Sequence, residues 1–221
     1  DVSIMTAEDP VEFNVDGITQ VLVRTDIGLT FAAALRSFLR QDPDIIMVGE
    51  IRDGETADIA IKAALTGHLV FSTLHTNDAP STINRLMDMG VPSYLVAAST
   101  KLIMAQRMVR KICVFCKQEV PVTAQIIDAL RLTPEEAKTF KLFEGKGCNQ
   151  CNNTGFSGRT GLFEVMPITP AIEKMIVLNA STSEIRAQAV SEGMLSLRHA
   201  GLEKLCLGIS SLGEIVAETA L

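Results

Sequence analysis

Short apolar runs alternate with helix-like segments through the first half of the chain, and this alternation restricts the fold more than any other feature. Residues 45–48 and 69–74 have the length and composition of buried strands, and residues 57–65 between them have the pattern of a helix that stops at Gly67. Consecutive units of this kind form a parallel sheet with helices packed on its faces. The sequence therefore predicts an α/β fold.

Segments on either side extend this pattern. Residues 30–39 carry apolar side chains at helical spacing, which leaves Arg36 and Arg40 together on the outer face of the predicted helix. The other predicted elements in this part are two strands, 2–5 and 18–23, and two helices, 81–89 and 93–107. Residues 1–110 are therefore expected to form one α/β core.

The composition changes beyond this core. Residues 113–161 are richer in turn-forming residues, and a capping box at 133–136 predicts a helix among them. Farther on, residues 162–166 have the pattern of a strand, and capping boxes at 181–184 and 211–214 each predict the start of a helix. We expect three parts: a core at 1–110, an inserted module at 111–161 and a mostly helical region at 162–221.

Four of the five cysteines form two Cys-x-x-Cys pairs, Cys113 with Cys116 and Cys148 with Cys151, and the fifth is Cys206. Two such pairs supply a complete tetrahedral set of sulfur ligands for Zn²⁺, and a filled set leaves no open position for a substrate. We therefore expect a structural zinc site in the inserted module. A thioredoxin-like redox role is the weaker alternative, because neither pair opens a strand–helix–strand unit.

Charge and hydropathy argue against two further classes of protein. The net charge of -6 and the pI of about 5.1 are unsuited to a broad nucleic-acid-binding surface. No apolar run approaches the roughly 18 residues that cross a bilayer, and the chain does not open with the basic and apolar regions of a signal peptide. We expect a cytosolic protein with no nucleic-acid partner and no membrane insertion.

Clustered acids follow the first predicted strand, where Glu8, Asp9 and Glu12 lie close together in the sequence. Open α/β sheets bind ligands at the carboxyl ends of their strands, and carboxylates there suit Mg²⁺ or a water that must be activated. An acidic surface turn with Pro10 at its corner explains the same residues equally well.

Two more segments place polar residues at the ends of predicted strands. The strand 45–48 has Asp44 before it and Glu50 after it, as in a Walker B strand whose carboxylate polarises the attacking water of phosphoryl transfer. His68 and His75 flank the next strand, where an imidazole can contact a phosphate. The alternatives are solvated acids at the ends of a buried strand and histidines that are merely hydrogen-bonded.

The order and joint presence of these segments resemble the secretion ATPase superfamily. Residues 6–13 resemble its Asp box, residues 42–53 its Walker B box and residues 66–76 its His box. Over its whole length the chain is similar to the type IV pilus assembly ATPases. The resemblance implies part of a RecA-like P-loop NTPase core that works with ATP and Mg²⁺, together with a zinc-binding tetracysteine module.

The same resemblance implies roles for individual residues. Glu8 and Glu50 would be the catalytic acids, with Glu50 acting on the attacking water, while His68 and His75 would sense the terminal phosphate. The residues expected near nucleotide, Mg²⁺ or a subunit contact are Asp9, Glu12, Asp44, Arg36, Arg40, Arg52 and Arg85. For Arg36 and Arg40 a solvated helix face is the alternative.

One motif of that family is missing, because no G-x-x-x-x-G-K-[ST] segment occurs in the 221 residues. The nearest likeness, at residues 155–161, has the wrong spacing and no lysine. We expect the chain to be the C-terminal part of a longer ATPase, inactive alone because it lacks the loop that cradles the phosphates.

The resemblance further implies a homo-hexameric motor, peripheral at the cytoplasmic face of the inner membrane. Such a motor couples ATP hydrolysis to movement of an inner-membrane platform protein and so powers type IV pilus extension. The paired cysteines favour an assembly motor over a retraction motor, and residues 75–80 and 201–210 favour pilus assembly over type II secretion. A type II secretion ATPase is the nearest alternative, and a zinc-stabilised interaction module without activity is the alternative of another class.

Overall fold

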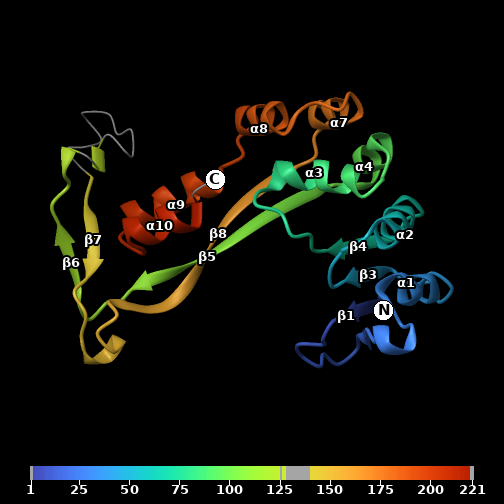
Figure 1. Cartoon of the computed structure of the whole chain (residues 1–221), viewed down its shortest axis with the longest axis horizontal. Helices are drawn as coiled ribbons and strands as arrows, with labels where there is room; N and C mark the ends of the chain where they lie inside the picture. The colour runs from blue at the N-terminus through green and yellow to red at the C-terminus, as the bar shows by residue number, and fades with distance from the viewer. Residues whose placement is uncertain (1, 125, 128–139, 220–221) are drawn as a thin grey trace. The chain divides into compact units, whose positions relative to one another are not determined.

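A computed structural model describes residues 2–124, 126–127 and 140–219 of the chain (Figure 1). The chain divides into two compact units. The first unit comprises Asp1–Ile103 with Met166–Glu192, and the second comprises Met104–Val165 with Gly193–Leu221. Each unit has its own buried residues, and the two are described separately below.

A four-stranded parallel sheet forms the centre of the first unit. Its strands, in spatial order, are β2 (Thr19–Leu22), β1 (Ile4–Glu8), β3 (Ile45–Val48) and β4 (Leu69–Ser72). Met5 lies opposite Ile46, and Ile46 lies opposite Val70, so these side chains share one face of the sheet. The predicted α/β fold with a parallel sheet is confirmed.

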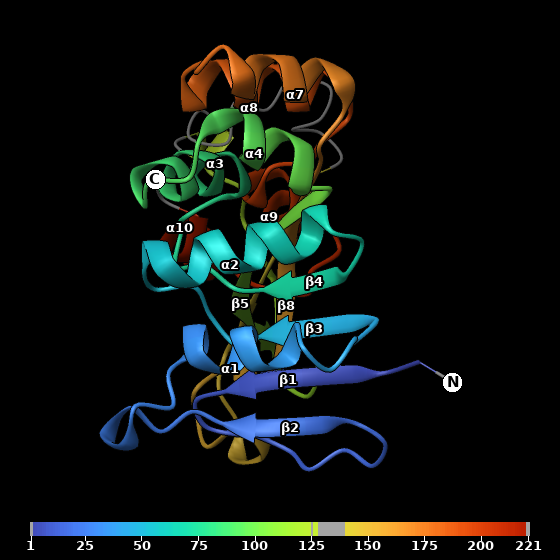
Figure 2. The ribbon, with the colours of Figure 1, turned by 90° about the vertical axis from the view of Figure 1, so that its right-hand side faces the viewer.

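Helices α1 (Phe31–Phe38) and α2 (Gly54–Leu65) pack on this face of the sheet (Figure 2). The Thr30 hydroxyl accepts a hydrogen bond from the backbone N–H of Ala33, and the Asp53 carboxylate accepts one from Thr56, so each helix begins at a capping residue. Leu35 and Phe38 are buried, which places Arg36 on the exposed face of α1, as predicted. Helix α2 begins three residues before its predicted start because Asp53 caps it there.

Four further helices complete the first unit: α3 (Ala79–Asp88), α4 (Ser93–Ser99), α7 (Pro170–Val177) and α8 (Thr182–Ser191). Asp78 caps α3 and also accepts a hydrogen bond of 2.6 Å from Arg186 on α8. The Asn84 amide on α3 donates to Thr182 on α8 at 2.6 Å. The predicted capping box is present at Ser181, whose hydroxyl accepts from the backbone N–H of Glu184. Polar contacts therefore join segments that lie far apart in the sequence.

The predicted helix at residues 93–107 is wrong in its second half. Helix α4 ends at Ser99, and strand β5 (Leu102–Ile112) follows it. Leu, Met, Ala, Gln and Arg favour helices, but Ile103, Ala105 and Val109 are buried while Met104 and Met108 are exposed, which is the alternation of a strand. Pairing with a distant segment therefore overrides the local helix preference.

The described residues of the second unit include two small sheets and, near its C-terminal end, two helices. Strand β5, which begins at the boundary of the first unit, pairs with β8 (Phe156–Pro167), and β6 (Lys117–Val120) pairs antiparallel with β7 (Leu142–Gly145). The helices are α9 (Leu197–Cys206) and α10 (Leu212–Thr219). Strand β8 contains the predicted strand 162–166 and extends beyond it at both ends.

Helices α7, α8, α9 and α10 make up most of the C-terminal quarter, where helices were predicted. The Ser211 hydroxyl accepts from the backbone N–H of Glu214 at 3.4 Å, but the Glu214 carboxylate accepts from Arg110 rather than closing the predicted capping box. The helix predicted from residue 133 lies outside the described residues. Within the described part of the chain, no helix combines the length and the apolar character needed to cross a membrane.

Candidate active site

The carboxyl ends of the parallel strands bring together three of the four residues predicted to be catalytic. Glu8 ends β1, Glu50 lies two residues beyond β3, and His75 lies three residues beyond β4. Backbone hydrogen bonds hold the loops that follow these strands, from Gly49 to Ala7 at 2.8 Å and from Ile51 to Thr73 at 2.9 Å. The three side chains therefore share one edge of the sheet, where open α/β folds bind their ligands.

Glu50 lies between two basic side chains. Its carboxylate accepts hydrogen bonds from the Arg52 guanidinium and from Nε2 of His75, the latter at 3.0 Å, and the side chain is only 14% exposed. The Arg52 hydrogen bond, opposed by burial and supported by His75, holds the pKa of Glu50 below its usual range. Arg52 also lies 3.7 Å from the Asp9 carboxylate. Glu50 is therefore an ionised carboxylate near neutral pH.

Glu8 is held by neutral donors. The Thr6 hydroxyl donates to its carboxylate at 2.6 Å and the Gln20 amide donates at 2.9 Å, and these hydrogen bonds lower the pKa of Glu8. Thr6 lies opposite Gln20 in the register of β1 and β2. Sequence reasoning missed the contribution of Gln20, because a lone glutamine on an edge strand gives no signal. Only the strand register identifies it.

Close packing keeps the two acidic segments adjacent. A Cβ atom added to Gly49 would lie 3.2 Å from the carbonyl oxygen of Ala7 and 3.5 Å from Cα of Glu8. Two ionised carboxylates at such an edge suit a hard cation such as Mg²⁺, which prefers oxygen ligands and retains waters. The same edge offers Glu50 as an acceptor for the proton of an attacking water.

Other predicted site residues lie elsewhere in the first unit. His68 precedes β4, where its Nδ1 lies 3.0 Å from the carbonyl oxygen of Ala63, and Asp44 precedes β3 and accepts from the backbone N–H of Ser3 at 2.7 Å. Both residues are thus at the amino ends of parallel strands, away from Glu50.

Arg36 pairs with Glu55, and the exposed residues Arg40 and Glu12 lie after α1 and after β1. The roles predicted for these residues, and for His68 and Asp44, stay predictions.

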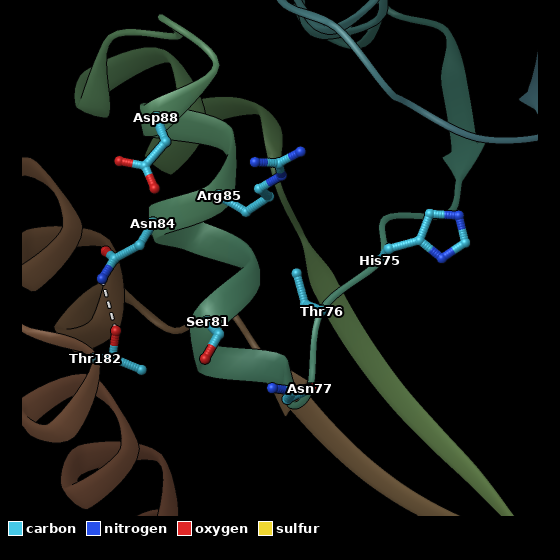
Figure 3. Close-up of a pocket in the computed structure, with 8 residues that line it drawn as sticks. All are labelled: His75, Thr76, Asn77, Ser81, Asn84, Arg85, Asp88 and Thr182. Atoms are coloured by element: carbon cyan, nitrogen blue, oxygen red, sulfur yellow. Dashed lines mark hydrogen bonds between the residues drawn. The ribbon is translucent and has the colours of Figure 1, made fainter. Parts of the chain in front are cut away.

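Arg85 and His75 line the same pocket (Figure 3). Figure 3 shows Arg85 on α3 with its side chain directed to the side on which His75 lies. The other lining residues are polar: Thr76, Asn77, Ser81, Asn84, Asp88 and Thr182. The pocket is open, and its lining combines one cation, Arg85, with one anion, Asp88, among hydrogen-bonding side chains.

The four paired cysteines form a separate cluster in the second unit. The Sγ atoms of Cys113, Cys116, Cys148 and Cys151 all lie within 4.8 Å of one another, with separations of 3.7 to 3.9 Å for three of the pairs. A tetrahedron of sulfurs about 2.3 Å from a zinc ion has edges of about 3.8 Å. Backbone N–H groups of Gly147, Cys148 and Gly155 donate to these sulfurs at 3.2 to 3.3 Å. The residues therefore fit a zinc ion, both in spacing and in the donors that stabilise thiolates.

Comparison with known proteins agrees with this architecture. A family model described as "Type II/IV secretion system protein" matches residues 1–217. The type IV pilus assembly ATPase PilB of Myxococcus xanthus is 52% identical over 221 residues, which cover 100% of this chain and 39% of that protein. Type II secretion system protein E of Klebsiella pneumoniae is 43% identical over 217 residues, covering 98% of this chain and 43% of that protein.

A solved structure shows the same fold. The crystal structure of the pilus retraction motor PilT with bound ADP is 27% identical, with a TM-score of 0.70, and the match covers 100% of this chain and 53% of that one. The chain thus spans about two fifths of the length of the two curated relatives named above. The resemblance predicted from the acidic and histidine segments is confirmed: the chain belongs to the family of type II/IV secretion system proteins.

Proposed function

We propose that this chain supplies the catalytic acids of a motor ATPase that acts in a secretion or type IV pilus machine. The observation that carries the proposal is the position of Glu50, which is ionised, largely shielded from solvent and hydrogen-bonded to His75 at the carboxyl edge of the parallel sheet. Phosphoryl transfer to water uses a polar residue at that place to orient the attacking water, and a carboxylate can also accept its proton. The names of the relatives support the same reaction class.

Each residue at the edge has a distinct task in this proposal. Glu50 accepts a hydrogen bond, and then the proton, from the water that attacks the terminal phosphate. Glu8 and Asp9 would hold Mg²⁺, which would supply positive charge that neutralises the phosphates. His75 leaves Glu50 to contact the terminal phosphate, which links the presence of that phosphate to the position of the carboxylate. Arg52 holds the Glu50 carboxylate in position through its hydrogen bond.

The finer proposal is the assembly motor of a type IV pilus. The pilus assembly ATPase of M. xanthus is more similar to this chain than the type II secretion protein of K. pneumoniae, at 52% against 43% identity. In this proposal the whole protein is a cytoplasmic homo-hexamer with RecA-like cores, peripheral at the inner membrane, where it drives a platform protein. The tetracysteine cluster holds a structural zinc ion in the segment 111–161. Type II secretion is the second candidate, because both kinds of relative match nearly the whole chain.

A comparison of two proteins tests the proposal. Phosphate release from ATP, with Mg²⁺ and zinc present, is measured for the 221-residue chain and for a longer protein extended upstream to include a G-x-x-x-x-G-K-[ST] segment. We expect turnover by the longer protein and none by the shorter chain, because backbone N–H groups of such a loop are needed to cradle the phosphates. A longer protein that binds no nucleotide and releases no phosphate would contradict the proposed activity.

A further inference from the structure

The position of His75 depends on the loop that carries it. Its side chain is 86% exposed, so the surrounding side chains do not enclose the imidazole, which makes a hydrogen bond of 3.0 Å to Glu50. Residues 73–78 connect β4 to α3, and Figure 3 shows the stretch from His75 to Asn77 leading into the start of α3. The contacts that fix the two ends of this loop therefore decide where His75 lies.

The end of the loop next to β4 is tied to the residues on either side of Glu50. The Thr73 hydroxyl donates to the carbonyl oxygen of Gly49 at 2.7 Å, and the backbone N–H of Ile51 donates to the carbonyl oxygen of Thr73 at 2.9 Å. This end of the loop therefore moves together with the segment that carries the carboxylate.

The other end of the loop is tied to α3. The hydroxyl oxygens of Thr76 and Thr82 lie 2.9 Å apart, and the Asp78 carboxylate accepts a hydrogen bond from the backbone N–H of Ser81 at 2.8 Å. Thr82 is buried, so the core holds its hydroxyl in place. Because His75 is next to Thr76 in the sequence, a displacement of α3 would change the position of the imidazole.

Helix α8 in turn determines where α3 begins. Arg186 on α8 donates to the Asp78 carboxylate at 2.6 Å, and the Asp78 side chain is only 6% exposed. Beside this pair, Asn84 on α3 donates to Thr182 on α8 at 2.6 Å (Figure 3). A buried carboxylate that loses its cation is left with an uncompensated charge. Because Asp78 caps α3, any movement of its side chain toward water would displace the start of the helix and the loop before it.

We propose that Arg186 is a positioning residue for the reaction proposed above, acting through Asp78 and α3 to hold His75 against Glu50. A displacement of a reacting group by about 1 Å is enough to slow an enzyme on the order of 10²-fold. The consequence for catalysis rests on the proposed function. The geometric part, that Arg186 maintains the contact between His75 and Glu50, is testable without nucleotide.

An NMR measurement on the 221-residue chain tests the geometric part. The chain has three histidines, so the imidazole signals of His75 can be assigned by their loss in His75→Gln. Glu50→Gln should shift these signals in the otherwise unaltered chain, because it replaces the carboxylate that His75 contacts. In the Arg186→Gln chain the same change at Glu50 should shift them far less. No shift in the first case, or equal shifts in both, would overturn the proposal.

Two further backgrounds separate the ion pair from general loss of structure. Arg186→Lys keeps a cation beside Asp78 and should restore much of the shift. The double variant Asp78→Asn with Arg186→Met keeps a cap for α3 and leaves no unpaired buried charge, so it decides the question if Arg186→Gln does not fold. Its shift should also be small, and a shift of the unaltered size would overturn the proposal.

The matched control is Arg110→Gln, which breaks another pair of 2.6 Å, with Glu214, in the second unit. This pair does not touch α3 or the loop that carries His75. The shift caused by Glu50→Gln should therefore keep its unaltered size in the Arg110→Gln chain. A reduced shift there would show that loss of any ion pair has the same effect, which would contradict the role given to Arg186.

Kinetics of the longer protein, the one with the upstream phosphate loop, test the consequence for catalysis. Arg186→Gln should lower kcat about tenfold or more and leave KM within about a factor of two, because it displaces His75 rather than the groups that bind ATP. In a His75→Gln background, Arg186→Gln should cause no further loss, since the two residues act in series. A purely structural role would lower kcat by the same factor in both backgrounds, and that result would overturn the proposal. If the longer protein shows no turnover, the proposed function fails and the NMR result alone decides the role of Arg186.

Discussion

Two carboxylates in the first unit show how single residues are fixed by distant partners. Glu50 is held by Arg52 and by His75, which lies 25 residues away in the sequence. Asp78 is held by Arg186, at a sequence distance of 108 residues. Glu50 lies at the proposed reaction site, whereas Asp78 joins α3 to α8 and has a structural task. The same chemistry, an ionised acid beside a cation, therefore serves both roles.

Asp78 gives a prediction for stability as a function of pH. Burial alone raises its pKa, but hydrogen bonds from Ser81 and Arg186 outweigh burial, so the pKa lies below the usual value of 3.8. A carboxyl with a lowered pKa contributes its stability above the usual value and loses it as the pH falls through the folded value. Asp78→Asn, which can still cap α3, should lower the free energy of unfolding by about 2 kcal/mol at pH 7.

Urea unfolding at several pH values checks this prediction. The difference between the unaltered chain and Asp78→Asn should be constant between about pH 5 and pH 8 and should shrink below about pH 4. Asp88→Asn is the control, because Asp88 is exposed at the end of the same helix and should change stability by less than about 0.5 kcal/mol. A difference that grows as the pH falls would contradict the assignment.

At the scale of elements, the packing of α9 against α10 depends on a glycine. A Cβ atom on Gly201 would lie 2.6 Å from Cγ2 of Ile215, which is fully buried, whereas a Cβ atom on Gly213 would meet nothing within 4 Å. Alanine improves a helix by up to about 1 kcal/mol over glycine, but overpacking a core costs about 1 to 3 kcal/mol. Gly201→Ala should therefore destabilise the protein and Gly213→Ala should stabilise it, each by about 1 kcal/mol or less. Thermal unfolding of the two variants measures the signs, and equal signs would show that α9 and α10 do not pack as described.

The cysteine cluster gives a second prediction at this scale. Zinc binding to such a module is coupled to its folding, so chelation should remove amide-exchange protection from β6 and β7 while β1, β3 and β4 keep theirs. Cys148→Ser should reproduce this loss and reduce the zinc content. Cys206→Ser should leave both unchanged, because Cys206 is on α9 outside the cluster. Full protection of β6 and β7 without zinc would refute the structural role.

Helices and strands were predictable where the local sequence pattern agrees with the burial that the fold imposes. The runs that became β3 and β4 and the capping box of α8 have strong local patterns, and the structure confirms them. The strand β5 was not predicted, because its residues favour helices and its alternation becomes decisive only through pairing with β8. Asp78 also went unrecognised as a cap, although Pro80 near the start of α3 gave a signal for it.

At the scale of the whole molecule, the sequence predicted which residues meet at the carboxyl edge of the sheet. It did not predict the hydrogen bonds between distant segments. Residues that follow parallel strands must meet at one edge, so Glu8, Glu50 and His75 were identifiable from position alone. The Gln20 and Arg186 contacts depend on strand register and on segments far apart in the chain, which no local pattern encodes. The chain spans about two fifths of the length of the two curated relatives named above, so the activity of the whole protein stays a proposal.

The most direct test of the account is a single-turnover measurement on the longer protein, with nucleotide binding and phosphate release recorded separately for Glu50→Gln. Glu203→Gln, on the exposed face of α9, is the control. If Glu50 acts on the attacking water, the variant should bind ATP about as well as the unaltered protein and release phosphate about 10² to 10⁴ times more slowly. If Glu50→Gln releases phosphate at the unaltered rate, Glu50 is not the catalytic carboxylate and the proposed site is wrong.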